Sequence, residues 1–187
     1  MVIRLLEGRV VDLRVVERDD VDFRVECRNN IEFWGEYVNI AQPLSKSEWL
    51  KRFDNPSNLD LLMEKRSFII EKKDGTRIGV ITHWINQPSR MTEISYAIIP
   101  SERRKGYGTE AVQLILDYLF LSKDLMRIQA VTNVRNKPSQ RVLEKAGFRN
   151  EGTIRKSYYA RGTWIDNYVY SILREEWKEP KILTKAR

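Results

Sequence analysis

The sequence has few of the residues that build disulfide and metal sites. Among its 187 residues there is one cysteine, Cys27, and one histidine, His83. A lone cysteine excludes an intrachain disulfide bond and is typical of proteins from the reducing cytoplasm. A lone histidine excludes a metal site built on several imidazoles. We therefore predict a cytoplasmic protein with no bound metal.

Long apolar runs are also missing. No segment approaches the roughly twenty apolar residues that cross a bilayer. The N-terminus carries Arg4 and Glu7 too early for a signal peptide. No repeat, low-complexity tract or Pro/Gly/Ser-rich linker divides the chain. We expect no membrane partner and a single domain over residues 1–187, in which residues 178–187 form a frayed basic tail.

The composition is that of an ordinary globular protein with a positive charge. Hydrophobic residues make up 42% and charged residues 32%, and the net charge is +7. Such an excess suits either a nucleic-acid-binding protein or one that holds a ligand with several phosphate charges. The charge alone leaves both open.

The first part of the chain predicts a strand and two helices. Val10–Val16 alternates apolar and polar residues, as a strand does. Asp19 or Asp20 can cap a helix that reaches about Arg28, although the same stretch also alternates with a strand-like period. A loop and a short helix follow: Asn29–Pro43, with Phe33, Trp34 and Tyr37, and then a helix capped by Ser45 or Ser47 that includes Phe53 and ends at Asn55–Asn58. This region can wall an acceptor pocket or simply cover the sheet.

The rest of the chain predicts a three-stranded meander followed by helices and strands in alternation. Asp74-Gly75 is a strong hairpin turn and Gly147 a helix C-terminal residue. The expected strands are Ser67–Lys72, Arg77–Ile85, Thr92–Ile99, Ile128–Val134, Arg149–Tyr159 and Thr163–Leu173, with turns at Gln87-Pro88-Ser89 and Arg161-Gly162, and the expected helices are Gly108–Ser122 and Pro138–Ala146. This order mixes an antiparallel meander with a βαβ crossover in one sheet.

The junction between the third meander strand and the long helix has the features of a phosphate-binding loop. The basic triplet Arg103-Arg104-Lys105 is followed by Gly106 and Gly108 at the helix start. Glycines allow close backbone approach, and the amides and dipole of a helix N-terminus favour an anion. A dinucleotide-binding fingerprint would need an acidic residue about twenty positions later, and a Walker A loop would need its lysine after the glycine. Neither condition is met.

The triplet of positions Arg103, Gly106 and Gly108 resembles Arg-x-x-Gly-x-Gly, the acetyl-coenzyme A loop of the GNAT N-acetyltransferases. About thirty residues later, Asn136-x-x-Ser139 followed by Leu143-Glu144-Lys145-Ala146-Gly147-Phe148 resembles the second motif of the same family. The resemblance extends from about Ser67 to the end of the chain. It is closest to the branch of the RimJ and RimL protein N-terminal acetyltransferases.

The resemblance implies a mixed α+β fold. Its central, mostly antiparallel twisted sheet has about seven strands with one splayed parallel pair, flanked by about four helices. It also implies acetyl-CoA as donor, with the pantetheine arm in the splay and the pyrophosphate on the loop. The residues that it assigns to cofactor binding are Ile98, Ile99, Arg103, Arg104, Lys105, Gly106, Tyr107, Gly108, Thr109, Asn136 and Ser139.

The implied reaction is direct attack of an amine on the thioester, which needs a base for the amine and a hydrogen-bond donor for the departing thiolate. Many family members carry a tyrosine seven residues after the motif asparagine, where this chain has Leu143. By resemblance to RimL-like members, Ser139 is our choice of donor, and Glu93 is our choice of base. The reserves are Tyr158 and Tyr159 as donors, and Asp166, Glu32 and Glu36 as bases.

The acceptor stays open at this stage. A protein N-terminal amine is our first expectation and a small amine, such as a polyamine, an amino acid or an aminoglycoside-type drug, the second. A GNAT fold that binds the cofactor without catalysis is a further alternative, since the usual tyrosine is missing. Nucleic-acid binding is disfavoured because the basic triplet is tied to a Gly-x-Gly loop and other charges are mixed in sign. A homodimer is possible.

Overall fold

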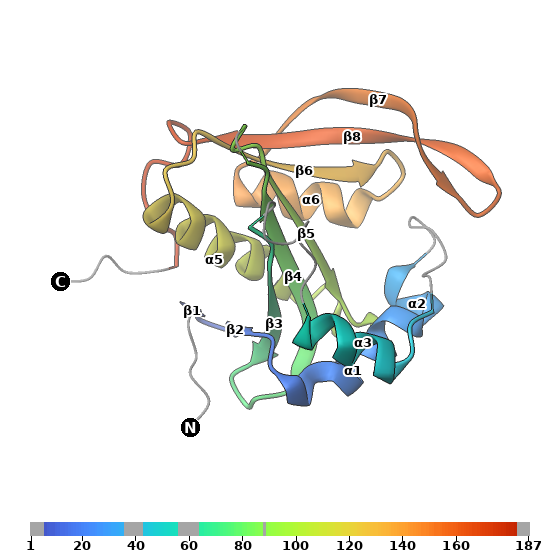
Figure 1. Cartoon of the computed structure of the whole chain (residues 1–187). Helices are drawn as coiled ribbons and strands as arrows, with labels where there is room; N and C mark the ends of the chain where they lie inside the picture. The colour runs from blue at the N-terminus through green and yellow to red at the C-terminus, as the bar shows by residue number, and fades with distance from the viewer. Residues whose placement is uncertain (1–5, 36–42, 56–63, 88, 183–187) are drawn as a thin grey trace.

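A computed structural model describes residues 6–35, 43–55, 64–87 and 89–182. One eight-stranded sheet runs through it in the order β1-β2-β3-β4-β5-β6-β8-β7 (Figure 1). The strands are β1 Leu6–Glu7, β2 Val11–Val15, β3 Arg66–Lys72, β4 Arg77–Ile85, β5 Thr92–Ile98, β6 Arg127–Asn133, β7 Arg149–Ala160 and β8 Thr163–Leu173. The helices are α1 Val21–Asn29, α2 Ile31–Trp34, α3 Lys46–Asp54, α5 Tyr107–Ser122 and α6 Lys137–Ala146, with 3-10 turns at Arg18–Asp20 and Pro100–Glu102.

The expected mixed α+β architecture is confirmed, and the differences are short elements. The ambiguous segment that begins at Asp19 is helical, with Val21 and Cys27 buried on its inner face. The described part of the chain adds the two-residue strand β1 and the single-turn helix α2, which lies inside the expected aromatic loop. Elements this short leave too few residues for a period to be read. Tyr37, Pro88 and residues 56–58 lie outside the described residues.

Side chains fix the ends of several elements where the sequence predicts them. The Ser45 hydroxyl accepts from the Glu48 amide at 3.2 Å, and the Glu48 carboxylate accepts from the Ser45 amide at 2.9 Å, so α3 begins in a capping box. Gly147 ends α6 with a φ of 100°, in the left-handed region that favours glycine. At the β3–β4 hairpin the Asp74 carboxylate accepts from the Thr76 amide at 2.9 Å. Local chemistry thus sets these boundaries.

The core lies mainly between the sheet and α5. Ala111, Val112, Leu114 and Ile115 of this helix are completely buried, which agrees with its wide apolar surface. Helices α1–α3 gather on the other side of β3–β5, beside their lower halves in Figure 1. None of the described helices is both long enough and apolar enough to span a membrane.

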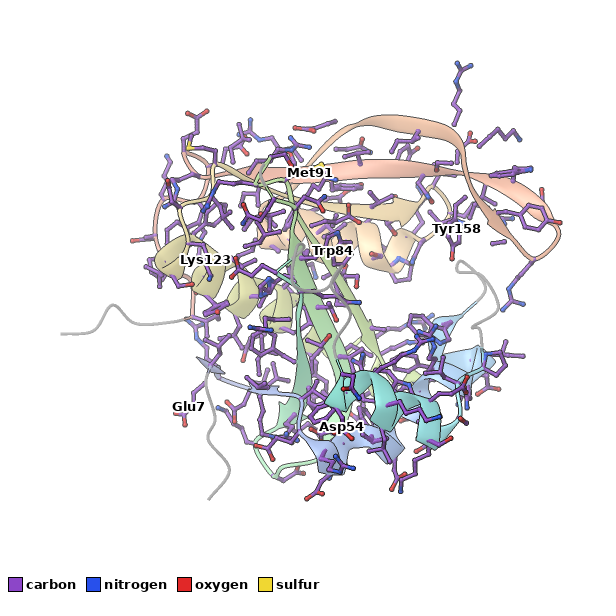
Figure 2. All side chains as sticks on the ribbon, viewed as in Figure 1. Glu7, Asp54, Trp84, Met91, Lys123 and Tyr158 are labelled. Atoms are coloured by element: carbon purple, nitrogen blue, oxygen red, sulfur yellow. The ribbon has the colours of Figure 1, made fainter. Side chains whose placement is uncertain are left out.

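The parallel neighbours β5 and β6 pair at only two positions, Thr92 with Ile128 and Glu93 with Gln129. Beyond them the strands separate, so the expected splay is present. Figure 1 shows β3–β5 and β6–β8 running in clearly different directions from this point. Met91, one residue before β5, lies at the joined end, and Asp54, the last residue of α3, lies at the far end (Figure 2). We call the Glu93–Gln129 position the vertex of the splay.

The expectation of a frayed tail from residue 178 needs correction. Asp117, buried on α5, accepts hydrogen bonds from the amides of Lys181 at 3.0 Å and Ile182 at 2.7 Å. The Trp177 indole also donates to this carboxylate, at 2.9 Å. Residues 178–182 are therefore anchored, because a buried carboxylate takes their backbone donors as its partners. Residues 183–187 lie outside the described part.

Candidate active site

The vertex carries a partly buried carboxylate. The Gln129 side-chain amide donates to Glu93 Oε2 at 3.0 Å. Burial raises the pKa of Glu93, and the hydrogen bond from Gln129 opposes this shift only in part. The carboxyl group of Glu93 can therefore exchange a proton closer to neutral pH than an ordinary glutamate does.

The glycines of the loop mark the start of α5. Gly106 is the N-cap, with a φ of 89° that favours glycine, and its carbonyl accepts from the amides of Thr109 at 3.0 Å and Glu110 at 3.2 Å. The amides before Thr109 lie where a helix has no acceptor of its own. A Cβ at Gly108 would make only ordinary contacts, 3.8 Å from Ile98 and from Val142. The backbone conformation therefore accounts for a glycine at 106, whereas contacts within the described protein do not account for the one at 108.

The basic triplet does not act as one unit. Arg103 is exposed, but its guanidinium is engaged by backbone carbonyls: Nε donates to Ile98 O at 3.0 Å and Nη2 donates to Phe33 O at 2.6 Å. It thereby joins α2 to the end of β5. Lys105 pairs with Glu102 at 3.0 Å, and Arg104 is exposed with a φ of 65°. Of the three cations, Arg104 and Lys105 lie most open to a ligand, whereas Arg103 is engaged with backbone carbonyls.

The backbone at the end of β5 divides between the sheet and the splay. The Ile99 amide donates to Ile78 O at 2.8 Å, and Ile99 O accepts from the Glu102 amide at 3.0 Å. Both peptide groups expected to pair with the pantetheine arm at Ile99 are therefore already used. Because peptide groups alternate between the two edges of a strand, those of Ile98 and Tyr96 face the splay. Ile98 keeps its amide for a ligand, while its carbonyl is held by Arg103.

The second motif brings Asn136 and Ser139 to the first turn of α6. Asn136 Oδ1 accepts from the Ser139 amide at 3.2 Å, so Asn136 is the N-cap, and its Nδ2 has no partner within the described ranges. The Ser139 hydroxyl lies 3.0 Å from the Tyr96 hydroxyl on β5. Asn136 can thus cap the helix and still donate to a ligand.

The two candidate catalytic side chains lie on opposite sides of the sheet, Glu93 on β5 itself and Ser139 on α6, which packs against the other face of β5. Side chains alternate along a strand, so Glu93 points to the face opposite Tyr96, whose hydroxyl contacts Ser139. The structure does not bring Glu93 and Ser139 into contact. A ligand lying in the open splay is accessible from both faces, so the separation is compatible with an amine arriving on one side and a thiol leaving on the other.

The reserve candidates lie elsewhere. Tyr158 and Tyr159 are exposed near the free end of the β7–β8 hairpin, where Figure 2 shows Tyr158. Asp166 accepts from the Lys156 amide at 2.8 Å within the same hairpin. Glu32 is an exposed residue of α2, and Glu36 lies outside the described residues. None of the described reserves lies at the vertex.

Sequence reasoning missed Tyr96 and Gln129. Tyr96 is bonded to Ser139, and burial raises its pKa, so its phenol stays protonated at neutral pH. Gln129 holds Glu93. The available signal was only strand alternation, which places Tyr96 on the helix-covered face but does not identify its partner 43 residues later.

These features fit a long ligand that ends in phosphates. A helix start with an unexplained glycine lies beyond the open end of two strands, and spare backbone groups line the gap. Arg161 of the hairpin donates to Gly35 O at 2.9 Å, so this end is bordered by α2 and by the hairpin. In the described ranges, no cluster of three or more His, Cys, Asp or Glu side chains could hold a metal ion. The site defines a class of proteins that bind an extended phosphate-bearing cofactor in a splayed sheet.

Comparison with known proteins identifies the family. The family model described as acetyltransferase (GNAT) domain matches residues 11–149. The chain is 38% identical over 138 residues to YnaD of Bacillus subtilis, named an uncharacterized N-acetyltransferase, covering 74% of this chain and 80% of YnaD. It is 32% identical to B. subtilis YdaF, a putative ribosomal N-acetyltransferase, covering 72% and 81% of the two chains.

A solved structure of another acetyltransferase has the same fold. Spermidine N-acetyltransferase from Vibrio cholerae, in complex with CoA and spermine, superposes with a TM-score of 0.76 at 26% identity, covering 90% of this chain and 98% of that one. The chain therefore belongs to the GNAT acetyltransferase family. It is an N-acetyltransferase with acetyl-CoA as its acyl donor.

Proposed function

We propose that this enzyme acetylates the N-terminal amine of a protein or peptide, as expected for the RimJ/RimL branch. The observation that carries this proposal is that, among the residues the structure describes, Glu93 is the one carboxylate at the vertex. Glu93 has a neutral partner, Gln129, and therefore keeps its negative charge available for one amine. A cytoplasmic location and a homodimer stay predictions.

The charges around the vertex support an acceptor with one positive charge. A second carboxylate on this face is Glu151, which Arg127 engages through two contacts of 2.5 and 2.6 Å and Ser171, the residue paired with Gln129, through one of 2.6 Å. This pairing lowers the pKa of Glu151 to about 2 and neutralises its charge locally. A polyamine carries several ammonium groups and needs several free carboxylates, which the described residues at the vertex do not offer.

The proposed roles follow from these contacts. Glu93 accepts a proton from the amine, whose ordinary pKa of about 7.7–8.0 for an N-terminus leaves it largely protonated at neutral pH. The bound donor supplies a thioester carbonyl as the electrophile. The α5 start, with Arg104, Lys105 and Gly106 to Thr109, holds the pyrophosphate, while Ile98 N and Asn136 Nδ2 hold the arm. Ser139 donates a hydrogen bond to the sulfur as it leaves.

A small polyamine is the second candidate. It is favoured by the likeness to the V. cholerae enzyme, whose structure was solved with spermine. The net charge of +7 opposes it, since a positive surface repels a polycation. The N-terminal amine therefore remains the first choice.

An acceptor panel tests the proposal. Purified enzyme, acetyl-CoA and either short peptides with varied first residues or spermidine and spermine are mixed, and release of free CoA thiol is followed. We expect the highest kcat/KM with a peptide, and none when its N-terminus is already acetylated. A higher kcat/KM with spermidine than with every peptide would assign the polyamine instead. No thiol release above hydrolysis with any amine would indicate a non-catalytic CoA-binding module.

A further inference from the structure

The hydroxyl groups of Tyr96 and Ser139 form a contact between the splayed strand and the second motif. Tyr96 lies on β5, three residues beyond the vertex, and Ser139 lies in the first turn of α6. Their oxygens are 3.0 Å apart, and Tyr96 Oη is also 3.2 Å from Ser139 O. A contact between residues so far apart in sequence fixes the Ser139 side chain relative to the sheet that borders the splay.

The number of protons in this contact allows two arrangements. Each hydroxyl has one proton to donate. In the first arrangement Tyr96 donates to Ser139 O, and Ser139 donates to Tyr96 Oη. In the second, Tyr96 donates to Ser139 Oγ, and the Ser139 proton is free to point elsewhere. The two distances permit both, and the exchange needs only hydroxyl rotation.

We propose that Tyr96 is a positioning residue for Ser139, which directs the Ser139 proton toward the departing sulfur. The proposal rests on the donor role of Ser139 in the proposed function. With no ligand, the first arrangement satisfies both hydroxyl groups. When negative charge develops on the sulfur, Ser139 turns its proton to it, and the Tyr96 proton moves to Ser139 Oγ.

The chemical step balances without a proton leaving either hydroxyl. The ammonium group first releases one proton through Glu93 to water. The neutral amine nitrogen then forms a bond to the carbonyl carbon, its second proton passes to the ionised Glu93, and the carbon–sulfur bond breaks with its electron pair on sulfur. Ser139 and Tyr96 stabilise the thiolate through hydrogen bonds only. A chain of two hydrogen bonds polarises its first donor, so Ser139 is a stronger donor with Tyr96 behind it than alone.

The residue at position 143 indicates what the contact between Tyr96 and Ser139 supplies. Leu143 lies one helical turn after Ser139 and is completely buried in the main core. The phenol that many family members carry at this position is therefore absent from α6. Tyr96 brings a phenol to the same helix from the neighbouring strand.

A double-mutant cycle tests the inference. The experiment compares Tyr96→Phe, Ser139→Ala and the double variant with the wild type. The acceptor is the peptide with the highest kcat/KM in the acceptor panel, acetyl-CoA and peptide are both saturating, and CoA release measures kcat. Tyr118→Phe is the matched control, since this phenol lies on α5 among core aromatic rings. Tyr96→Phe removes one oxygen and keeps the ring, so the packing is preserved. Thermal unfolding and acetyl-CoA affinity are measured for each variant.

We expect Tyr96→Phe to lower kcat by about five-fold, the size of one hydrogen bond, with acetyl-CoA affinity unchanged within about two-fold. In the Ser139→Ala background the same change should cost less than about two-fold, because its partner is gone. Tyr118→Phe should retain full kcat. Equal losses from Tyr96→Phe in both backgrounds, or no loss in either, would overturn the positioning role while leaving the donor role standing. Full kcat in Ser139→Ala would instead remove the donor role itself.

Discussion

His83 gives the fold a specific sensitivity to acid. Its ring is completely buried on β4, and its centroid lies 6.1 Å from those of both Phe68 and Tyr118. Neither ring nitrogen has a hydrogen-bond partner among the described residues. Burial lowers the pKa of His83 to about 4. Folded protein therefore keeps this imidazole neutral at a pH where the unfolded chain already binds a proton.

The sign and size of the effect follow from linkage. Because the folded pKa of about 4 lies below the ordinary histidine value of about 6.5, the unfolded state binds more protons in this window. The free energy of unfolding thus falls as the pH drops below about 6.5. Between pH 8 and pH 5 we expect His83 alone to remove about 2 kcal/mol.

The substitution His83→Leu tests this reasoning, because it replaces the imidazole by an apolar side chain of similar volume and removes the two ring nitrogens that lack partners among the described residues. Urea unfolding of the wild type and the variant is measured at pH 8, 7, 6 and 5. We expect the difference in unfolding free energy to shift by about 2 kcal/mol in favour of His83→Leu between pH 8 and pH 5. Other titrating groups cancel in this difference. Parallel curves for the two proteins would refute a buried neutral histidine.

Two further predictions concern charged groups. Arg14 is buried between Asp20, at 2.8 Å, and Glu71, at 2.7 Å, so Arg14→Met should lower the free energy of unfolding by about 3–5 kcal/mol, measured in urea. Arg18 and Asp54 form an exposed pair, so Arg18→Met should lower it by less than about 1 kcal/mol. Equal losses in the two variants would contradict the account. Glu93→Gln should lower kcat by about a hundred-fold or more and abolish the acid limb of the pH profile, which in the wild type should lie above the ordinary glutamate pKa of about 4.3. An unchanged acid limb would exclude Glu93 as the base.

Local sequence patterns predicted those parts of the site whose chemistry is local. The N-terminus of α5 and the cap of α6 follow from glycine, proline and asparagine at fixed positions, and both helices begin within a residue or so of the expected place. The splay followed from the family resemblance, since no period within β5 or β6 indicates where their pairing stops. The order and type of the longer helices and strands could therefore be predicted from the sequence.

Contacts between elements that are far apart in the sequence could not be predicted from it. Arg103 was expected on phosphate, yet its guanidinium reaches Phe33 O, 70 residues away. Ile99 was expected to face the arm, but one position along a strand reverses the direction of its peptide groups. The bond between Tyr96 and Ser139 joins a strand to a helix through tertiary packing alone.

The most direct test of the account is acetyl-CoA binding to Gly108→Leu. A Cβ fits at this position in ordinary contact with Ile98 and Val142, so a side chain can start here without a clash. If the pyrophosphate lies on this turn as proposed, the rest of the leucine side chain should interfere with it. Ser122→Leu, at the exposed other end of α5, is the matched control. Isothermal titration should show one-to-one binding to the wild type and to Ser122→Leu. Gly108→Leu should bind at least about ten-fold more weakly, a loss of about 1.4 kcal/mol, with an unchanged unfolding midpoint. Equal affinity of all three proteins would contradict the assignment of this loop as the cofactor site.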